Sequence, residues 1–315
     1  MNQHSDSDRN HYRIEVNNLT KRYGDFAAVN QATFTVEPGS MTGFLGANGA
    51  GKTTTMRMIM GLLEPTEGQV LVNGQPITAA QRASFGYMPE ERGLYPKQPI
   101  LEQLVYLGQL RGMPATHARK VATEHLEQLG LGDRLKAKLE SLSLGNQQRV
   151  QIVASILHHP TALILDEPFS GLDPKAVDTM ITMLHRLMRE GVPVLFSSHQ
   201  LDLVDRLCDR VVILHQGEVK AAGSAEELRT AGPARFRLRA SEDAGWLRDH
   251  LLVNAGTVQV VDISGQEAVL QWDVYSAEVA NIRAQILADA LQHGLEEFSR
   301  ITPTLGEIYR GVTNQ

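Results

Sequence analysis

The sequence predicts an α/β fold followed by a second, smaller α+β domain. Three observations indicate this. Apolar runs alternate with helical segments between residues 162 and 214, as they do where parallel strands are covered by helices on both faces. A glycine-rich loop at residues 46–51 follows an apolar run and opens a helix. Beyond residue 234 the pattern changes to strand, helix, strand, strand, helix, strand, which predicts a separate domain.

The composition is that of an ordinary globular chain long enough for two domains. Of the 315 residues, 42% are hydrophobic and 21% charged, and the formal net charge is -6, so no overall basic field attracts nucleic acid or anionic lipid. The single cysteine, Cys208, excludes an intramolecular disulfide and is expected to be a small buried residue. Residues 1–11 lack the apolar core of a signal peptide and predict a disordered lead-in. No segment approaches the roughly 20 apolar residues that span a bilayer, which predicts a cytosolic protein.

The first half of the chain begins with strands and ends with helices. Strands are expected at residues 12–16, 31–39 and 41–46, a helix at 53–63, and a hairpin at 68–77 around Asn73 and Gly74. From about Gly93 to Gly130 apolar residues recur at helical spacing without strands between them. This stretch predicts a helical insertion.

In the second half of this region, predicted strands and helices alternate. A polar stretch at residues 141–151 opens a helix, and the strands and helices then follow in turn. The expected strands are 162–166, 192–198 and 210–214, and the expected helices are 175–191 and 201–209. A short helix and a Gly-Pro linker at residues 223–233 end the pattern.

The order of elements after Ala234 predicts a ferredoxin-like βαββαβ domain. A nucleic-acid module, a small-molecule sensor and a brace for a dimer are the alternatives for its role. Residues 234–315 hold seven arginines and eleven acidic side chains, which argues against nucleic acid. We therefore favour bracing or regulation of a dimer. The segment 302–312 is expected to form a short helix that packs back on the chain.

The loop "GANGAGKTT" fits the pattern G-x-x-x-x-G-K-[ST] of a phosphate-binding loop. Its backbone N–H groups and the N-terminus of the following helix surround negative phosphates, and Gly51 leaves room where a Cβ would collide. Lys52 is expected on the β- and γ-phosphate oxygens, and the Thr53 hydroxyl on Mg2+. The loop residues predicted to bind nucleotide are Gly46, Asn48, Gly49, Gly51, Lys52, Thr53 and Thr54.

The segment "LILDEP" at residues 163–168 supplies carboxylates at the end of an apolar strand, where open α/β sheets bind ligands. Carboxylates there are costly unless they serve a cation or catalysis. Asp166 is predicted to hold Mg2+, and Glu167 to act as general base on the attacking water. The base-reading element N-K-x-D of GTPases is absent from the sequence, so ATP is favoured over GTP.

The segments "LSLGNQQR", "SGLD" and "FSSH" follow in the order found in the ATP-binding cassette (ABC) family, and residues 12–230 resemble that family. The resemblance implies a P-loop NTPase cassette with an antiparallel β subdomain and a helical insertion at about residues 93–158. It also implies a homodimer in which two cassettes meet head to tail. Each nucleotide site is then completed by the partner, so ATP closes the dimer and hydrolysis opens it.

The resemblance also assigns roles to matched positions outside the phosphate loop. Ser143 and Gly145, in the signature segment, contact ATP held by the second copy, helped by the helix dipole. Asp173 of "SGLD" connects the two sites across the dimer. His199 contacts the γ-phosphate and holds the Glu167 water, while Tyr23 stacks on adenine.

The sequence departs from the family pattern in two segments, the signature and the segment around Glu90. Leu144 replaces the usual first glycine of the signature, and Asn146 replaces its glutamine. Glu90 stands where the glutamine that senses Mg2+ and water is usual, and we predict it as a Mg2+ ligand. The segment "PEERGLYP" around it is similar to cassettes of ABC-2 type exporters, among them sodium and drug efflux systems.

Transport is therefore the leading hypothesis. One cassette without a membrane segment is expected to dimerise and to drive a separate membrane permease from the cytoplasmic face of the plasma membrane. The surface around Arg92, Gly93, Leu94 and Tyr95 is the expected docking groove for a permease helix. The alternative is a soluble ABC ATPase of DNA repair or translation, but the sequence shows neither heptad arms nor a second cassette.

Overall fold

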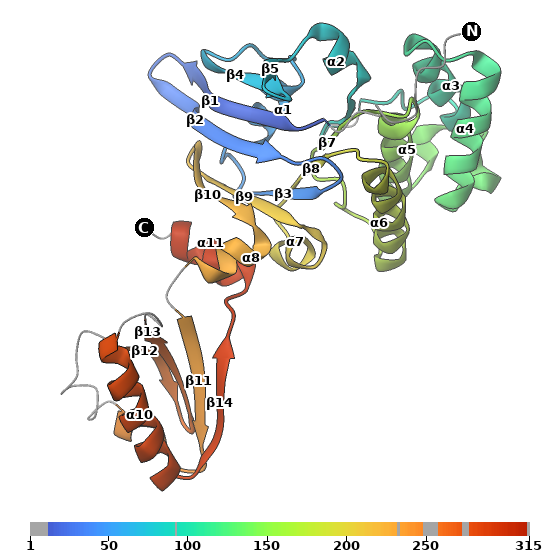
Figure 1. Cartoon of the computed structure of the whole chain (residues 1–315). Coiled ribbons are helices and arrows are strands. Elements are labelled where there is room, and N and C mark those ends of the chain that lie inside the picture. Colours follow the sequence, from blue (N-terminus) through green and yellow to red (C-terminus); the bar gives the residue numbers. More distant parts are fainter. Residues whose placement is uncertain (1–11, 92, 232–233, 248–257, 273–276, 314–315) are drawn as a thin grey trace, which may run out of the picture. The chain divides into compact units, whose positions relative to one another are not determined.

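The computed structural model describes residues 12–91, 93–231, 234–247, 258–272 and 277–313. The predicted lead-in at residues 1–11 lies outside the described residues. The chain divides into two compact units, Met1–Ser224 and Ala225–Gln315, and each is described separately (Figure 1).

The first unit contains a four-stranded antiparallel sheet in the order β2-β1-β4-β5. Its hairpin β4–β5 turns at Asn73 and Gly74, whose φ angles of 52° and 75° are both positive, as a two-residue hairpin turn requires. The hairpin predicted at this position is therefore confirmed. The strands of this sheet are β1 (Ile14–Tyr23), β2 (Phe26–Val36), β4 (Glu67–Val72) and β5 (Gln75–Pro76).

A six-stranded sheet in the order β10-β9-β3-β8-β7-β6 forms the centre of the first unit. Neighbouring strands from β9 to β6 are parallel, and only β10 pairs antiparallel. The apolar runs predicted as strands form β3, β7, β8 and β9, while β6 and β10 are additional. These strands are β3 (Met41–Leu45), β6 (Gly86–Met88), β7 (Leu163–Leu165), β8 (Val194–Ser198), β9 (Arg210–His215) and β10 (Glu218–Ser224).

Helix α1 (Lys52–Ile59) packs between the two sheets, where its Met56 and Ile59 join a core that takes side chains from both. On the other side of β3, helix α7 (Leu201–Leu207) and Cys208 lie very close to Gly43. A Cβ on Gly43 would come within 2.8 Å of the Cys208 sulfur. Cys208 is buried, as the sequence predicts, and burial raises the pKa of its thiol. The unpredicted helix α2 (Ala79–Ser84) starts at a capping box made by Thr78 and Gln81.

The helical insertion lies where the sequence predicts helices without strands. Its first two helices start directly after prolines, which suit the beginning of a helix but not its interior. A Cβ on Gly108 would lie 2.8 Å from that of Ala118, so glycine allows these two helices to approach. The helices here are α3 (Ile100–Leu110), α4 (Ala115–Gln128) and α5 (Leu144–Ile156), with two 3-10 turns at Gly132–Arg134 and Leu139–Ser141; α6 (Pro174–Arg189) follows β7.

The second unit is a four-stranded antiparallel sheet in the order β12-β13-β11-β14, with a helix between β13 and β14. Phe236 and Trp272 stack on neighbouring strands with ring centroids 4.1 Å apart, inside a core that includes Ile286. Half of the predicted helix at 244–251, residues 248–251, lies outside the described residues. The elements are α8 (Ala225–Thr230), β11 (Ala234–Ala240), β12 (Val258–Ser264), β13 (Glu267–Trp272), α10 (Ala277–Gln292), β14 (Leu295–Ile301) and α11 (Leu305–Thr313).

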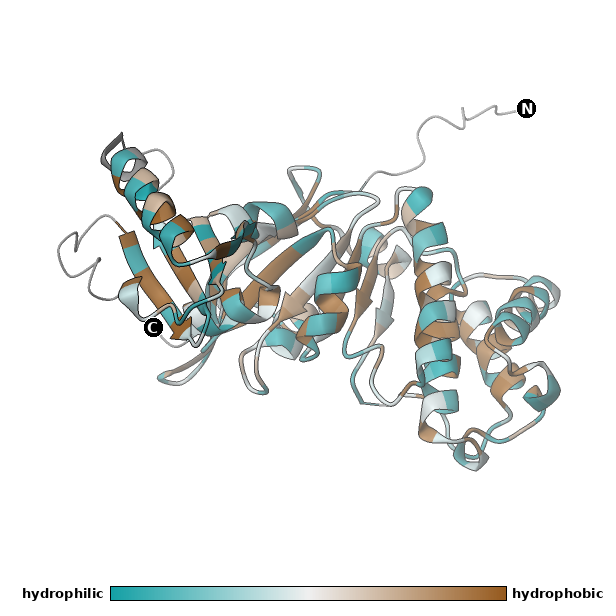
Figure 2. Cartoon of the chain, turned by 90° about the horizontal axis from the view of Figure 1, so that it is seen from below, coloured by the Kyte–Doolittle hydropathy of each residue, from teal (hydrophilic) through white to brown (hydrophobic). Residues whose placement is uncertain are grey.

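The boundary between the units differs from the one the sequence suggests. The motif pattern predicts that the first domain ends at residue 230, whereas helix α8 groups with the second unit, where it packs against α11. Strands of both units carry apolar residues, and the helices alternate between apolar and polar residues along their length (Figure 2). No helix among the described residues is both long and apolar enough to cross a membrane.

Candidate nucleotide-binding site

The phosphate-binding loop connects the buried strand β3 to helix α1. Gly51 precedes the helix with φ 104°, and a Cβ there would lie 2.6 Å from the Ala28 carbonyl, so only glycine fits. Lys52 is 7% exposed, and its ammonium donates to the carbonyls of Gly46 at 2.6 Å and Ala47 at 3.2 Å. The loop therefore holds a buried positive charge and a helix N-terminus together, which suits an anion.

Asp166 lies at the end of β7, next to the end of β8, and is 1% exposed. Its two carboxylate oxygens accept from different elements: Oδ2 from the Thr53 hydroxyl at 2.7 Å, and Oδ1 from the Ser197 hydroxyl at 2.5 Å. The carboxyl ends of neighbouring parallel strands meet at one edge of the sheet, which brings these residues together. The Thr53 and Asp166 oxygens are hard ligands suited to Mg2+.

Glu167 follows directly and adopts a left-handed backbone, with φ 49°. This conformation is uncommon for a residue other than glycine and costs roughly 1–3 kcal/mol. Its backbone N–H donates to the Ser197 hydroxyl at 2.8 Å. Nδ1 of the exposed His199 lies 3.0 and 3.1 Å from the two carboxylate oxygens of Glu167, whose side chain is 12% exposed. A carboxylate and an imidazole thus meet beside the phosphate loop.

A pocket of about 340 Å³ opens at this edge of the sheet. It brings together nine of the predicted site residues, whereas Tyr23, Gly46, His199 and the signature residues are not part of its lining. Tyr23 is 54% exposed, with the Lys21 ammonium 5.4 Å from its ring centroid. Phe26, its cross-strand partner, does line the pocket and was not predicted. The lining consists of Phe26, Ala28, Asn48, Gly49, Gly51, Lys52, Thr53, Thr54, Glu90, Asp166 and Glu167.

The signature segment lies against the loop "SGLD" of the same chain. Ser143 caps helix α5 by accepting from the Asn146 N–H at 3.4 Å, and a Cβ on Gly145 would come within 2.8 Å of the Gly171 carbonyl. Arg149 forms an ion pair with Asp173 at 2.8 Å. The backbone N–H of Ala176, and then Arg149, lower the pKa of the Asp173 carboxyl, so it remains ionised.

Three polar residues that were not predicted from the sequence support this site. Ser197 contacts both Asp166 and the Glu167 backbone, and two buried glutamines on α5 reach the neighbouring loops. Gln151 donates to the carbonyls of Pro89 and Glu91, on either side of the exposed Glu90. Gln148 donates to the loop of Glu167. A pair of glutamines three residues apart in a mostly buried helix is the signal that could have found them.

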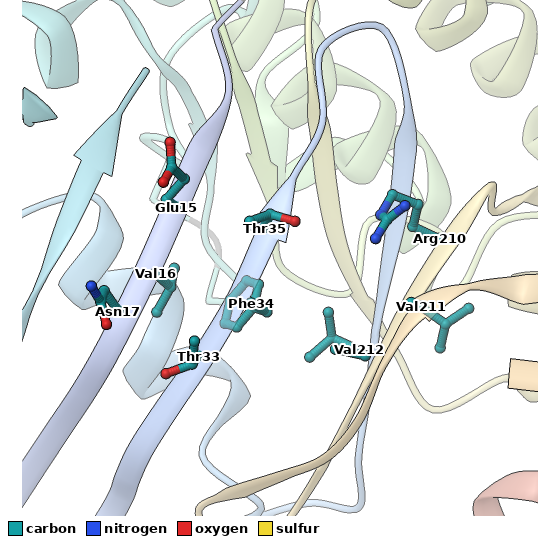
Figure 3. Close-up of a pocket in the computed structure, with 11 residues that line it drawn as sticks. Glu15, Val16, Asn17, Thr33, Phe34, Thr35, Arg210, Val211 and Val212 are labelled. Carbon is teal, nitrogen blue, oxygen red and sulfur yellow. The ribbon is translucent and has the colours of Figure 1, made fainter. Parts of the chain in front are cut away.

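Two other hollows of the first unit contain no predicted site residue. One of about 350 Å³ lies between strands β1, β2, β9 and β10, and is lined by Glu15, Phe34 and Arg210 among others (Figure 3). The other, of about 770 Å³, lies between helices α4 and α6 and has an apolar floor that includes Val121 and Met183. Neither combines a helix N-terminus with a buried lysine and carboxylates.

The residues present fit Mg2+ together with a nucleotide. Thr53 and Asp166 supply two oxygens, and no group of three or more His, Cys, Asp or Glu in the described part of the chain could hold a metal alone. Mg2+ commonly binds through one or two protein ligands, with substrate phosphates and water completing its shell. Two protein oxygens beside a phosphate loop match that coordination pattern.

Comparison with known proteins agrees with this geometry. The model of the family described as "ABC transporter" matches residues 29–170. The chain is 38% identical over 304 residues to the uncharacterized ABC transporter ATP-binding protein YhaQ of Bacillus subtilis, covering 94% of this chain and 97% of YhaQ. It is 33% identical to the linearmycin resistance ATP-binding protein LnrL of the same organism, covering 96% of this chain and 98% of LnrL.

A further relative is the Nod factor export ATP-binding protein I of Burkholderia lata, 35% identical, with 68% of this chain and 72% of that protein covered. Among solved structures, "Dimeric Structure of MJ0796, a Bacterial ABC Transporter Cassette" has a TM-score of 0.62 and 26% identity, covering 67% of this chain and 98% of that one. Sequence motifs, site geometry and similarity over nearly the full length agree. The chain belongs to the family of ABC transporter ATP-binding subunits, and it is an ATPase.

Proposed function

We propose that this chain is the Mg2+-dependent ATPase subunit of an ABC-2 type exporter, which dimerises head to tail on ATP and drives a separate membrane permease. The main support for the proposed ATP hydrolysis is a cluster beside Lys52, formed by Thr53, Asp166, Glu167 and His199. This cluster combines a phosphate cradle, a pair of metal-ligating oxygens and a candidate base.

In the proposed reaction the phosphate loop and Lys52 bind the triphosphate, and the Lys52 ammonium exchanges its loop carbonyls for phosphate oxygens. Glu167 removes a proton from the attacking water. His199 holds the Glu167 carboxylate, which it already contacts, and reaches the γ-phosphate. Thr53, Asp166 and Glu90 hold Mg2+, which neutralises charge on the phosphates. Phe26, which lines the pocket, and its exposed cross-strand partner Tyr23 stack on adenine.

The proposed dimer rests on the position of the signature. Ser143 and Gly145 do not line the pocket of their own chain, and the neighbouring Leu144 is 61% exposed. A second copy placed head to tail brings these residues to the other nucleotide, and a cassette of known structure, MJ0796, is described as dimeric. The second unit serves as a brace or regulator of this dimer. Its strand order β12-β13-β11-β14 supports the ferredoxin-like arrangement.

The proposed direction and cargo, export of sodium ions or drug-like compounds, rest on the segment "PEERGLYP" and on relatives named for Nod factor export and linearmycin resistance. A permease helix docks beside Tyr95, which is 57% exposed; Arg92, also predicted there, lies outside the described residues. Docking places the chain at the cytoplasmic face of the plasma membrane. A soluble ATPase of DNA repair or translation is the alternative.

The test is purification of the Glu167→Gln protein with Mg-ATP from detergent-solubilised cells. We expect hydrolysis to be nearly abolished, a stable ATP-bound dimer, and a multispanning membrane protein in stoichiometric amount. Glu190→Gln, which replaces the exposed carboxylate that follows the last residue of α6 and lies outside this pocket, is the matched control and is expected to keep normal turnover. Unchanged turnover in Glu167→Gln would contradict the assigned base. Ribosomes or DNA in place of a membrane protein would favour the soluble alternative.

A further inference from the structure

The left-handed backbone of Glu167 is held from two sides. On the N–H side, the Ser197 hydroxyl of strand β8 accepts at 2.8 Å. On the carbonyl side, the side-chain amide of Gln148 donates to the Glu167 carbonyl at 3.0 Å. The next carbonyl, that of Pro168, accepts from the same nitrogen, also at 3.0 Å. A backbone conformation that is unfavourable for glutamate is therefore fixed between a strand and a helix.

Gln148 is well suited to this role because it is buried, with 6% of its surface exposed. An amide nitrogen carries two hydrogens, and the two carbonyls use both of them. Buried amides without partners are costly, so the bonds to the Glu167 loop fix the orientation of the side chain. Gln148 also lies on the first turns of α5, the helix that begins at the cap Ser143.

We propose that Gln148 is a positioning residue that keeps Glu167 in its left-handed conformation and ties it to the signature helix α5. This inference rests on the proposed role of Glu167 as general base. Its carboxylate direction depends on φ, so a Glu167 that relaxes to a commoner φ moves its oxygens away from His199 and from the attacking water. Displacement of a reacting group by about 1 Å can lower a rate on the order of 100-fold.

The test compares two substitutions on the same helix. Gln148→Met keeps the length of the side chain and removes the donor. Ser155→Ala removes a buried hydroxyl of the same helix, which donates to the carbonyl of Ile152 within α5. We expect Gln148→Met to lower kcat on the order of 10- to 100-fold with the KM for ATP within about twofold. Ser155→Ala is expected to leave both unchanged. A higher KM with normal kcat in Gln148→Met, or an equal loss of kcat in both variants, would overturn the proposal.

A double-mutant cycle separates positioning from a general lesion. If Gln148 acts through Glu167, adding Gln148→Met to Glu167→Gln lowers the residual single-turnover rate by less than about twofold, because the base is already absent. Independent, multiplicative losses would overturn the proposal. Loss of turnover in Glu167→Gln with normal kcat in Gln148→Met would overturn this inference alone. Normal turnover in Glu167→Gln would overturn the base assignment and this inference together.

A second variant covers the case in which Gln148→Met does not fold. Gln148→Asn keeps the amide but shortens the side chain by one methylene. The amide then cannot donate to both carbonyls, yet no apolar group is placed against them. We expect kcat to fall less in Gln148→Asn than in Gln148→Met, which removes the donor, and we expect the KM for ATP to be unchanged. Wild-type kcat in this variant, with the same thermal midpoint, would overturn the proposal.

Discussion

His199 and Glu167 contact one another across the ends of two adjacent strands, with Nδ1 of His199 3.0 Å from Oε1 of Glu167. The imidazole is largely exposed, whereas the carboxylate is 12% exposed. A partly buried carboxylate is thus oriented by a side chain that contributes little to the core. Function and stability can therefore be separated at this pair by mutation.

Substitution His199→Ala is expected to lower kcat on the order of 100-fold, because Glu167 loses the group that orients it. The unfolding free energy is expected to change by less than about 0.5 kcal/mol, as is usual for exposed sites. Steady-state hydrolysis and urea unfolding measure the two effects. His185→Ala, an exposed histidine on α6, is the control for turnover. A variant at 199 with normal kcat would contradict the role of this contact.

Substitution Thr53→Val is expected to raise the Mg2+ concentration needed for half-maximal hydrolysis by on the order of tenfold or more. Valine keeps the shape of threonine but has no oxygen for the metal and no donor for Asp166. Thr53→Ser retains the hydroxyl and is expected to behave like the wild type. Titration of ATPase activity with MgCl2 distinguishes the two. The same Mg2+ dependence in both variants would exclude Thr53 as a ligand.

The strands that carry the site could be predicted because they are buried on both faces and appear as continuous apolar runs, as in "ALILD" and "VPVLFSS". Strands β6 and β10 could not. β6 has three residues, and β10, "EVKAAGS", lies at the sheet edge and contains few β-branched residues. Its place is set by pairing with β9, a tertiary interaction that local composition does not encode.

The candidate site was predictable where residues act in a short motif. Thr53 and Asp166 stand far apart in sequence, and each is identified by its own motif. Ser197 and Gln148 are different, because each acts by contacting the backbone of Glu167. A serine in an apolar strand has no distinct local pattern, and the spacing of Gln148 and Gln151 indicates a buried polar pair without identifying the groups that it contacts. Their roles follow only once the strands and helix α5 are packed.

Substitution Gly145→Ala is expected to weaken ATP-driven dimerisation while preserving the fold. Alanine favours a helix over glycine by roughly 1 kcal/mol, but its Cβ would meet the Gly171 carbonyl at 2.8 Å. Moving that loop back to the position that the proposed dimer requires costs about 1–3 kcal/mol. Each 1.4 kcal/mol of this cost lowers the dimerisation constant about tenfold. Sedimentation with Mg-ATP in the Glu167→Gln background measures it. Gly311→Ala on α11, where nothing lies within 4 Å, is the control.

His158 is expected to make the protein less stable at acidic pH. Burial, and then Arg111, lower the pKa of this imidazole from 6.5 to about 4, and its Nε2 lies 3.3 Å from the Phe85 carbonyl. Between these two pH values the unfolded chain binds a proton that the folded chain does not. The contribution of His158 to stability is therefore constant above about pH 6.5 and falls as the pH decreases toward 4.

Substitution His158→Gln removes this titration and keeps a donor for the Phe85 carbonyl. Allowing for partial exposure, we expect the wild type to lose about 2 kcal/mol more than the variant between pH 7.5 and pH 4.5. Urea unfolding at the two pH values measures the difference. An identical pH dependence in the two proteins would show that His158 is protonated in the folded state as readily as in the unfolded one.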